Sequence, residues 1–289
     1  MRLATLKTAN GPVVVGVQSE SGIDRFVDLH AVEPGLPTTM VGLLATSDGL
    51  DRARSAFSKG ATQQKYVSGT LLAPIPAPPK ILCIGLNYRD HARETNAQIP
   101  DVPIVFSKFA TAVVGPGNPI VLPRVAQKVD YEAELVVVIG RRGKNIPESG
   151  AAGYVAGYMN GNDVSARDWQ LEKPGKQWLL GKTPDTFAPT GPYLVTADEI
   201  ADSRDLAIRL RLNGTTMQDS MTKELIFGVE RLIAHISQLV TLEPGDLIFT
   251  GTPPGVGIAR KPPVFLKPGD TVEVEIAGLG TLKNPVQAE

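Results

Sequence analysis

The sequence predicts an α+β protein whose main part is a β-rich, mixed-sheet roll or sandwich. Glycine and proline are both abundant, with 29 and 24 of 289 residues, which is typical of many turns that join short strands. Short apolar runs alternate with turn signals from Ile81 onward, whereas a helical period is clear only over about 223–240. Strand-rich segments with few helices indicate packed sheets in an α+β arrangement.

Residues 1–72 are predicted to form a small N-terminal α/β domain. Short strands are expected around 13–17 and 25–29, and two short helices near 38–45 and 51–58. The stretch 73–80, Ala-Pro-Ile-Pro-Ala-Pro-Pro-Lys, is a stiff connector, because proline fixes φ and has no amide hydrogen to donate. We therefore place a linker at 73–80 and a larger second domain at 81–289.

The second domain is predicted to consist of short strands and one amphipathic helix. In the helix, apolar residues recur every three or four positions, at Leu225, Val229, Leu232, Ile236 and Leu239. The expected strands lie at 104–106, 120–122, 135–139, 154–157, 193–196, 206–212, 247–250 and 271–276.

The composition excludes several classes of protein. A net charge of −1 with 20% charged residues gives no overall field that would attract nucleic acid or an anionic membrane. The single cysteine, Cys83, excludes an internal disulfide, and its apolar surroundings favour a buried hydrophobe over a nucleophile. No apolar stretch approaches the length of a membrane span, and no convincing signal core is present, so a cytoplasmic location is expected.

Two carboxylates introduce the most apolar strand of the chain. Glu132 and Glu134 are two residues apart, so in a strand both side chains leave the same face. The apolar run Leu135–Ile139 that follows suits a strand buried on both faces. Ionised carboxylates entering such a strand cost several kcal/mol each unless a cation compensates them. We interpret Glu132 and Glu134 as metal ligands.

A second pair of glutamates shows that the spacing alone proves little. Glu273 and Glu275 alternate with Val272, Val274 and Ile276. That pattern is typical of a half-exposed antiparallel strand, in which the glutamates are simply solvated.

Asp163 is the third candidate ligand. It follows a predicted strand and an apparent Gly-Asn turn, a loop position from which a carboxylate can converge on a site. Considered singly, it is better explained as a turn-capping residue, and only together with Glu132 and Glu134 is the ligand interpretation favoured. Three carboxylates without a cysteine or histidine pattern favour a hard divalent ion, Mg²⁺ or Mn²⁺.

His91 is the histidine whose neighbours suggest chemistry. Glu94 follows it at i+3, on the same side of a short helix expected to end before Pro100. A carboxylate beside an imidazole orients it and raises its basicity, as a water-activating base requires. A polar surface helix with incidental charges explains the same residues equally well. His30 lies near a strand end, and His235 within the amphipathic helix is expected to be structural.

Two further segments carry polar groups. Gly181-Lys-Thr183 lacks the earlier glycine of a phosphate loop, which leaves Lys182 as an isolated cation between a strand-like run and a turn. The segment Thr250–Gly257 is rich in backbone donors and is able to cradle a carboxylate or oxyanion, although structural turns use the same residues.

Together these motifs resemble the fumarylacetoacetate hydrolase family over the chain from Ile81 onward. The matching segments are Asn87-Tyr88 with His91 and Glu94, Ser107-Lys108-Phe109, Asp130–Glu134, Asn162–Gln170, Gly181–Thr183, Asp185–Phe187, Gly191-Pro192 and Thr250–Gly257.

The resemblance implies a mixed-sheet roll, a homodimer, and Mg²⁺ or Mn²⁺ held by Glu132, Glu134 and Asp163. It also implies that His91 and Glu94 act together on a lid over the substrate. The residues expected to bind the carboxylate and carbonyl oxygens of the substrate are Arg167, Gln170, Lys182 and the backbone around Thr252.

The first functional hypothesis is metal-dependent hydrolysis of a carbon–carbon bond in a small β-diketo acid such as an acylpyruvate. His91, oriented by Glu94, would activate water, and the departing enolate would rest on the metal near Lys182. The alternative is oxaloacetate tautomerisation or decarboxylation, or hydration or isomerisation of oxo acids at the same site. A third hypothesis, from another class, is a metal-stabilised binding module without catalysis.

Overall fold

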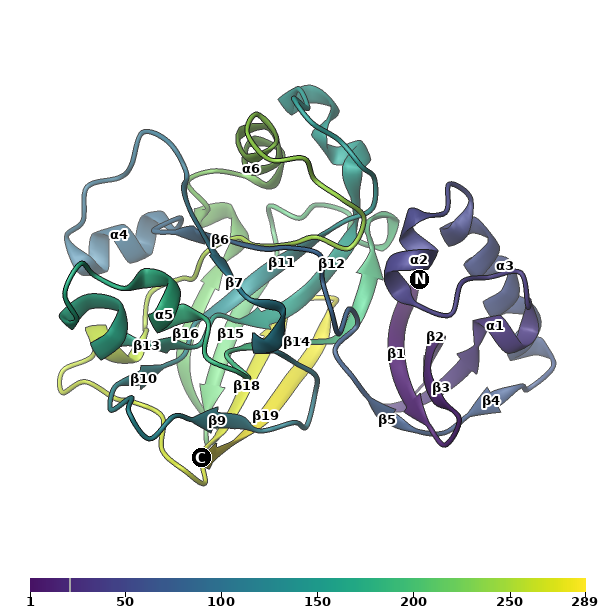
Figure 1. Ribbon diagram of the computed structural model, residues 1–289, viewed down its shortest axis with the longest axis horizontal. Coiled ribbons are helices and arrows are strands. Elements are labelled where there is room, and N and C mark those ends of the chain that lie inside the picture. The colour runs from purple at the N-terminus through teal and green to yellow at the C-terminus, as the bar shows by residue number, and fades with distance from the viewer. Residues whose placement is uncertain (21) are drawn as a thin grey trace.

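The computed structural model describes residues 1–20 and 22–289, and these form two packed β-sheets with helices around them (Figure 1). The strands of the larger sheet are β1 (Arg2–Thr8), β2 (Gly11–Glu20), β3 (Ile23–Asp28), β4 (Tyr66–Val67), β5 (Thr70–Leu71), β6 (Ile81–Gly85), β7 (Ile104–Lys108), β8 (Val113–Val114), β11 (Ala133–Ile139), β12 (Val155–Asn162), β14 (Ala188–Thr196) and β17 (Leu247–Phe249). The smaller sheet contains β9 (Ile120–Leu122), β15 (Ala207–Leu212), β16 (Thr215–Met221), β18 (Thr271–Ile276) and β19 (Gly280–Ala288). A two-stranded ribbon joins β10 (Val129–Asp130) and β13 (Ser165–Ala166).

The helices lie mostly outside the sheets. The α-helices are α1 (Leu29–Val32), α2 (Met40–Ala45), α3 (Gly49–Thr62), α4 (Arg89–Thr95), α5 (Trp178–Lys182) and α6 (Val229–Ser237). A π-helical turn forms η3 (Asp168–Glu172), and 3₁₀ turns form η1 (Ala110–Ala112), η2 (Glu148–Tyr154), η4 (Ala197–Glu199), η5 (Thr222–Glu224) and η6 (Gly257–Ala259).

The larger sheet runs in the order β4-β3-β2-β1-β14-β12-β11-β17-β6-β7, with β5 beside β1 and β8 beside β14. The smaller sheet runs β16-β15-β18-β19-β9 and contacts β11, β12 and β14 of the larger sheet. Antiparallel and parallel pairs occur in both sheets, because β17 pairs with β6 and β19 with β9 in parallel. The predicted α+β, mixed-sheet class is confirmed.

The N-terminal strands and helices lie on one side of the molecule, at the right of Figure 1. Their strand β1 pairs with β14, so that Arg2 lies opposite Val195 and Leu3 opposite Leu194. Strands from before and after the linker proposed at 73–80 therefore belong to one continuous sheet. The division into residues 1–72 and 81–289 stays a prediction about independent folding units.

Strand β11 is buried on both faces, as its unbroken apolar sequence indicates. Leu135 and Val137 belong to the core between the two sheets, whereas Val136 and Val138 belong to a second apolar cluster on the opposite face. Glu134 has the same parity as Val136, so its side chain leaves on the side away from the inter-sheet core. By contrast, β18 alternates half-buried and buried residues, which is the half-exposed strand predicted for Glu273 and Glu275.

The amphipathic helix is shorter than predicted. Helix α6 begins after Gly228 and ends at Ser237, whereas the apolar spacing predicts a helix over 223–240. Leu225 instead forms an isolated β-bridge with Tyr88, and Leu239 is 87% exposed. The apolar spacing thus extends beyond both ends of the helix. At the N-terminal end, Leu225 packs from an extended segment instead.

Candidate active site

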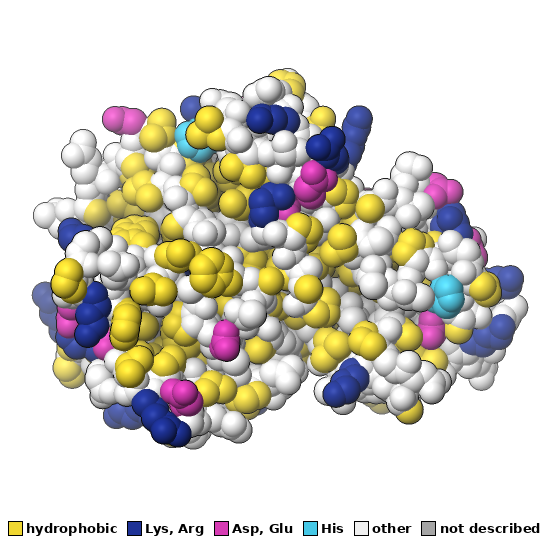
Figure 2. Space-filling model, in the orientation of Figure 1, with side chains coloured by type: hydrophobic (Ala, Val, Ile, Leu, Met, Phe, Trp, Pro, Cys, Tyr) yellow, Lys and Arg dark blue, Asp and Glu magenta, His cyan; other side chains and the backbone are white. Residues whose placement is uncertain are grey.

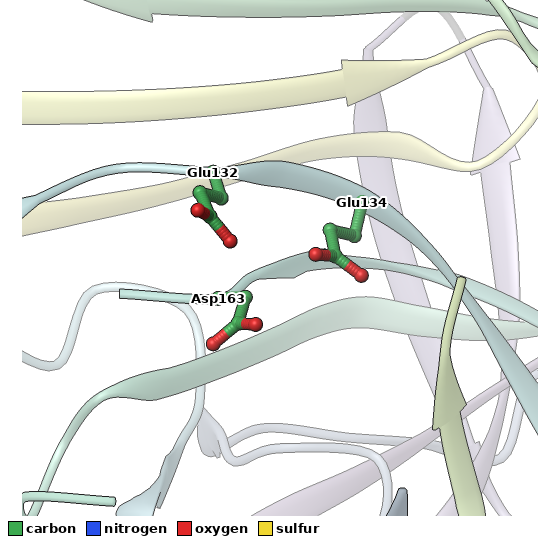
Figure 3. A group of neighbouring side chains, drawn as sticks. All are labelled: Glu132, Glu134 and Asp163. Carbon is green, nitrogen blue, oxygen red and sulfur yellow. The ribbon is translucent and has the colours of Figure 1, made fainter. Parts of the chain in front are cut away.

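Three buried carboxylates converge where β11 and β12 lie side by side (Figure 3). Glu132 immediately precedes β11, Glu134 lies within it, and Asp163 directly follows β12. One oxygen from each carboxylate lies within 4.8 Å of the others. The apparent turn before Asp163 is in fact the end of a strand, and the antiparallel register places Asn162 opposite Ala133. The structure thus brings the three predicted ligands together in a candidate cation site.

Two lysines contact this cluster. Lys182 Nζ lies 2.6 Å from Glu132 Oε2 and 2.9 Å from Asp163 Oδ2. Lys108 Nζ lies 2.6 Å from Asp163 Oδ1, and it also donates to the carbonyls of Val164 and Phe187. The sequence placed Lys182 between a strand-like run and a turn, whereas in the structure Lys182 ends helix α5. The sequence alone indicated no role for Lys108. Lys108 stands at the end of an edge strand, where an exposed lysine is the ordinary expectation.

Arg167 lies in the same cluster, with each guanidinium nitrogen bonded to a protein oxygen. Its Nε donates to Asp130 (2.8 Å), Nη2 to Glu132 (2.6 Å) and Nη1 to Gln170 Oε1 (3.0 Å). Asp130 in turn accepts the backbone N–H groups of Gly257 and Ile258. Arg167 therefore orients Glu132 and Gln170, while its predicted contact with substrate stays a prediction.

The electrostatic surroundings of the two glutamates differ sharply. Burial opposes ionisation of Glu132, but Lys182 and Arg167 outweigh it and lower its pKa to about 2. Burial raises the pKa of Glu134 well above its usual range, and the nearby Asp163 and Glu132 raise it further. Within the described residues, no cationic side chain forms an ion pair with Glu134, whose Oε2 accepts only the Gly251 N–H at 2.7 Å. Glu134 is thus the carboxylate that most needs an added cation or a proton.

His91 and Glu94 form the predicted pair on α4. His91 Nδ1 lies 3.0 Å from Glu94 Oε2, and Glu94 Oε1 accepts the Gly255 N–H at 3.0 Å. Because the carboxylate holds Nδ1, the other ring nitrogen is left for a ligand. Asn87 anchors the start of α4, since its side-chain amide donates to the Thr250 carbonyl at 2.7 Å and its Oδ1 accepts the Phe227 N–H.

The donor-rich loop 250–257 binds carboxylates, and these belong to the protein itself. Its N–H groups at Gly251, Gly255 and Gly257 each bind one of the protein's own carboxylates. Thr252 Oγ1 donates to the Ala133 carbonyl at 2.9 Å, which ties the loop to β11. The loop therefore positions acidic side chains, and binding of substrate by the backbone around Thr252 stays a prediction.

A cavity of about 170 Å³ lies beside the cluster. Its lining contains most of the predicted site residues, namely His91, Glu132, Glu134, Arg167, Gln170, Lys182 and Thr252. Asp163 and Glu94 do not line the cavity, but Asp163 contacts its lining through Lys182 and Glu94 through His91. Sequence reasoning missed the remaining lining, Ile84, Gly85, Leu86, Phe106 and Trp178, because apolar residues carry no chemical signal. The described residues of the structure thus gather one polar and one apolar wall around a small cavity.

Large apolar side chains are also exposed on the face that carries β7 and α5 (Figure 2). They include Ile104, Val105, Phe109, Leu179 and Leu180. Among the described residues, no helix is long and apolar enough to cross a membrane.

Comparison with known proteins identifies the family. Residues 80–287 match the fumarylacetoacetate (FAA) hydrolase C-terminal family. The chain belongs to the fumarylacetoacetate hydrolase family. It is 50% identical over 288 residues to a protein of Xenopus laevis named oxaloacetate tautomerase fahd2, mitochondrial, covering 99% of this chain and 90% of that protein.

Solved structures of the fumarylacetoacetate hydrolase family share the whole fold. A putative HpcE protein from Mycobacterium smegmatis is 39% identical with a TM-score of 0.85, covering 100% of this chain and 99% of that one. A fumarylacetoacetate hydrolase from Exiguobacterium antarcticum is 32% identical with a TM-score of 0.83, and both chains are covered completely. The chain is thus an enzyme of a family whose named members include tautomerases and hydrolases.

Proposed function

We propose that this enzyme interconverts the keto and enol forms of oxaloacetate, using a divalent metal ion. The observation that carries the proposal is the His91–Glu94 pair beside the same small cavity as Glu132 and Glu134. The relative from Xenopus laevis, named a tautomerase, supports this choice with half of its residues identical over nearly the whole chain. Of the activities expected from the sequence, the relatives thus favour the alternative over carbon–carbon bond hydrolysis.

The donor set fits a divalent cation. Four buried acids, Asp130, Glu132, Glu134 and Asp163, face three buried cations, Lys108, Arg167 and Lys182. With every group ionised, the sum is 3 − 4 = −1, and Glu134 has no cationic partner among the described residues. Adding a divalent ion would make the sum +1, which suits an anionic substrate. All-carboxylate oxygens match Mg²⁺ or Mn²⁺.

Tautomerisation requires one proton to move between carbon and oxygen. Glu132, Glu134 and Asp163 would hold the divalent ion, which would supply Lewis-acid charge to stabilise the enolate. His91, with Nδ1 held by Glu94, removes a proton from the carbon next to the carbonyl through its free nitrogen. The same proton is then delivered to the carbonyl oxygen, so one C–H bond breaks and one O–H bond forms without water being consumed. Lys182 provides positive charge close to that oxygen.

The remaining polar residues of the cavity are assigned to binding. Gln170 and Thr252 line the cavity, and Arg167 fixes the orientation of Gln170 through the bond between them. In the proposal, Arg167, Gln170 and the backbone around Thr252 bind the carboxylates of the substrate.

The proposal is tested by following the decay of enol absorbance of oxaloacetate with Mg²⁺ or Mn²⁺ present. His91→Ala should lower kcat/KM by about 10²- to 10⁴-fold, the usual contribution of a positioned acid–base group. His235→Gln on α6 is the matched control, since this histidine does not line the cavity. A His91→Ala protein with unchanged turnover would refute the assignment of the base.

Hydrolysis of an acylpyruvate is the second candidate, favoured by the structural likeness to the hydrolase from Exiguobacterium antarcticum. Acetylpyruvate and fumarylpyruvate assayed beside oxaloacetate separate the two activities. Cleavage of either acid, with oxaloacetate left at its uncatalysed rate, would establish the hydrolase instead.

We also propose that the enzyme is a homodimer that pairs through the apolar face of β7 and α5. Exposed apolar residues of this size are typical of a surface that binds another protein. A cytoplasmic location stays a prediction from the sequence, whereas the name of the Xenopus laevis relative places that protein in mitochondria.

A further inference from the structure

The lining of the cavity beside the acidic cluster also includes aromatic and aliphatic residues. This apolar wall consists of Ile84, Gly85, Leu86, Phe106 and Trp178. No part of the reaction proposed above uses these side chains. Their arrangement nevertheless decides how much of a ligand the cavity admits.

The indole of Trp178 lies directly on the backbone of Gly85. A Cβ atom built on Gly85 would lie 3.2 Å from Trp178 Cζ3 and 3.5 Å from Cη2. The shorter of these distances is tighter than nine in ten real Cβ contacts. Gly85 ends β6, and Trp178 begins α5, so the contact joins two elements that are far apart in the sequence. Gly85 therefore leaves space beside β6 that a larger residue would take from the indole.

A second aromatic ring holds Trp178 from the side. The centroids of Phe106 and Trp178 are 5.6 Å apart and their planes meet at 80°, an edge-to-face contact. Lys182 Nζ lies 5.2 Å from the centroid of Phe106, so this ring also borders the cation of the acidic cluster. Phe106 thereby links the position of Trp178 to the reacting end of the cavity.

We infer that Trp178, seated on Gly85 and held by Phe106, sets the maximum length of the 2-oxo acid that the site accepts. This inference rests on the proposed function and adds to it the size class of the substrate. The cavity of about 170 Å³ is smaller than the ~300–1,000 Å³ of pockets for drug-sized ligands. A short dicarboxylate is held by the polar wall, whereas a longer acyl chain has to occupy the space of the indole.

The inference is tested with straight-chain 2-oxo acids of increasing length as competitive inhibitors of oxaloacetate turnover. In the wild-type protein the inhibition constant should stop improving at a short chain. In Trp178→Ala the longer acids should bind about 10-fold tighter or more for each methylene that enters the vacated space. Trp178→Phe, which keeps an aromatic ring, should show a smaller gain and guards against misfolding of the alanine variant.

Gly85→Ala tests the same contact in the opposite direction. Gly85 does not adopt a positive φ, so alanine is compatible with its backbone, and the new methyl group should displace the indole by a few tenths of an ångström. The longest accepted acid should then bind more weakly, and this effect should vanish in the double variant with Trp178→Ala, because the two residues act through one contact. Leu239→Ala is the control, since this exposed leucine neither lines the cavity nor belongs to the apolar face of β7 and α5.

The outcomes separate this inference from the proposed function. If Trp178→Ala and Trp178→Phe keep the length profile of the wild-type protein, the role of Trp178 is refuted, whatever the reaction is. If wild-type protein fails to tautomerise oxaloacetate, the proposed function is refuted, and the length profile is then measured by direct calorimetric binding of the same acids.

Discussion

Replacement of Glu134 by glutamine keeps the shape of the side chain and removes its ability to ionise. The amide oxygen of Glu134→Gln is still able to accept the Gly251 N–H, which Glu134 Oε2 accepts at 2.7 Å in the wild-type protein. Glu134 is buried, and no described cation pairs with it. We therefore expect the variant to fold without metal at least as stably as the wild-type protein, although a buried residue is being changed.

The pH dependence in EDTA follows from the raised pKa of Glu134. Burial, with Asp163 and Glu132, keeps a proton on folded Glu134 that the unfolded chain releases near pH ~4.3. The folded state binds more protons over this range, so its stability falls as pH rises from about 4.3 toward the folded pKa. The loss is about 1.4 kcal/mol per pH unit for one group. Glu134→Gln should lack this decline.

Metal should stabilise the wild-type protein and leave Glu134→Gln unchanged. At a concentration 100 times its Kd, an ion that binds only the folded state stabilises it by about 2.7 kcal/mol, which corresponds to a rise in Tm of about 5–10 °C. This rise should occur in the wild-type protein and be absent from Glu134→Gln.

The assay is thermal unfolding from pH 5 to 8, in EDTA and in Mg²⁺ or Mn²⁺. Glu275→Gln is the matched control, because Glu275 has the same strand spacing to its neighbour but pairs with Arg211 at the surface. An equal metal-dependent rise in wild-type protein and Glu134→Gln would show that Glu134 is not a ligand. If Tm depends on pH in the same way in wild-type protein and Glu134→Gln in EDTA, burial does not disfavour the ionised form of Glu134.

Two further predictions concern Lys108 and the apolar face of β7 and α5, to which the sequence alone assigned no role. Lys108→Met should lower the free energy of unfolding in EDTA by about 3–5 kcal/mol, since Asp163 loses a buried partner 2.6 Å away. Urea unfolding measures this loss, and Mg²⁺ should restore part of it. A loss below about 1 kcal/mol would contradict the prediction. Val105→Glu or Leu180→Glu should convert the dimer to monomers, because either variant places a charge on the exposed apolar face. Light scattering measures the mass, and an unchanged dimer would show that the interface lies elsewhere.

The sequence by itself was sufficient to predict the α+β class, the buried strand at 135–139 and the acids around it. These features depend on periodicity and on the cost of burying a charge, and both are properties of a few neighbouring residues. The ends of α6 were less predictable, because apolar spacing also occurs where Leu225 packs from an extended segment.

Only the tertiary structure decided which groups meet across the sheets. Lys108 reaches Asp163, the N–H groups of the 250–257 loop bind the protein's own acids, and Trp178 rests on Gly85. Each of these contacts joins residues more than fifty positions apart, and it arises from the order and register of strands rather than from any local pattern. The local sequence thus determined which side chains are available for chemistry, while the packing of β6, β7, β11 and α5 determined the charge balance and the size of the cavity.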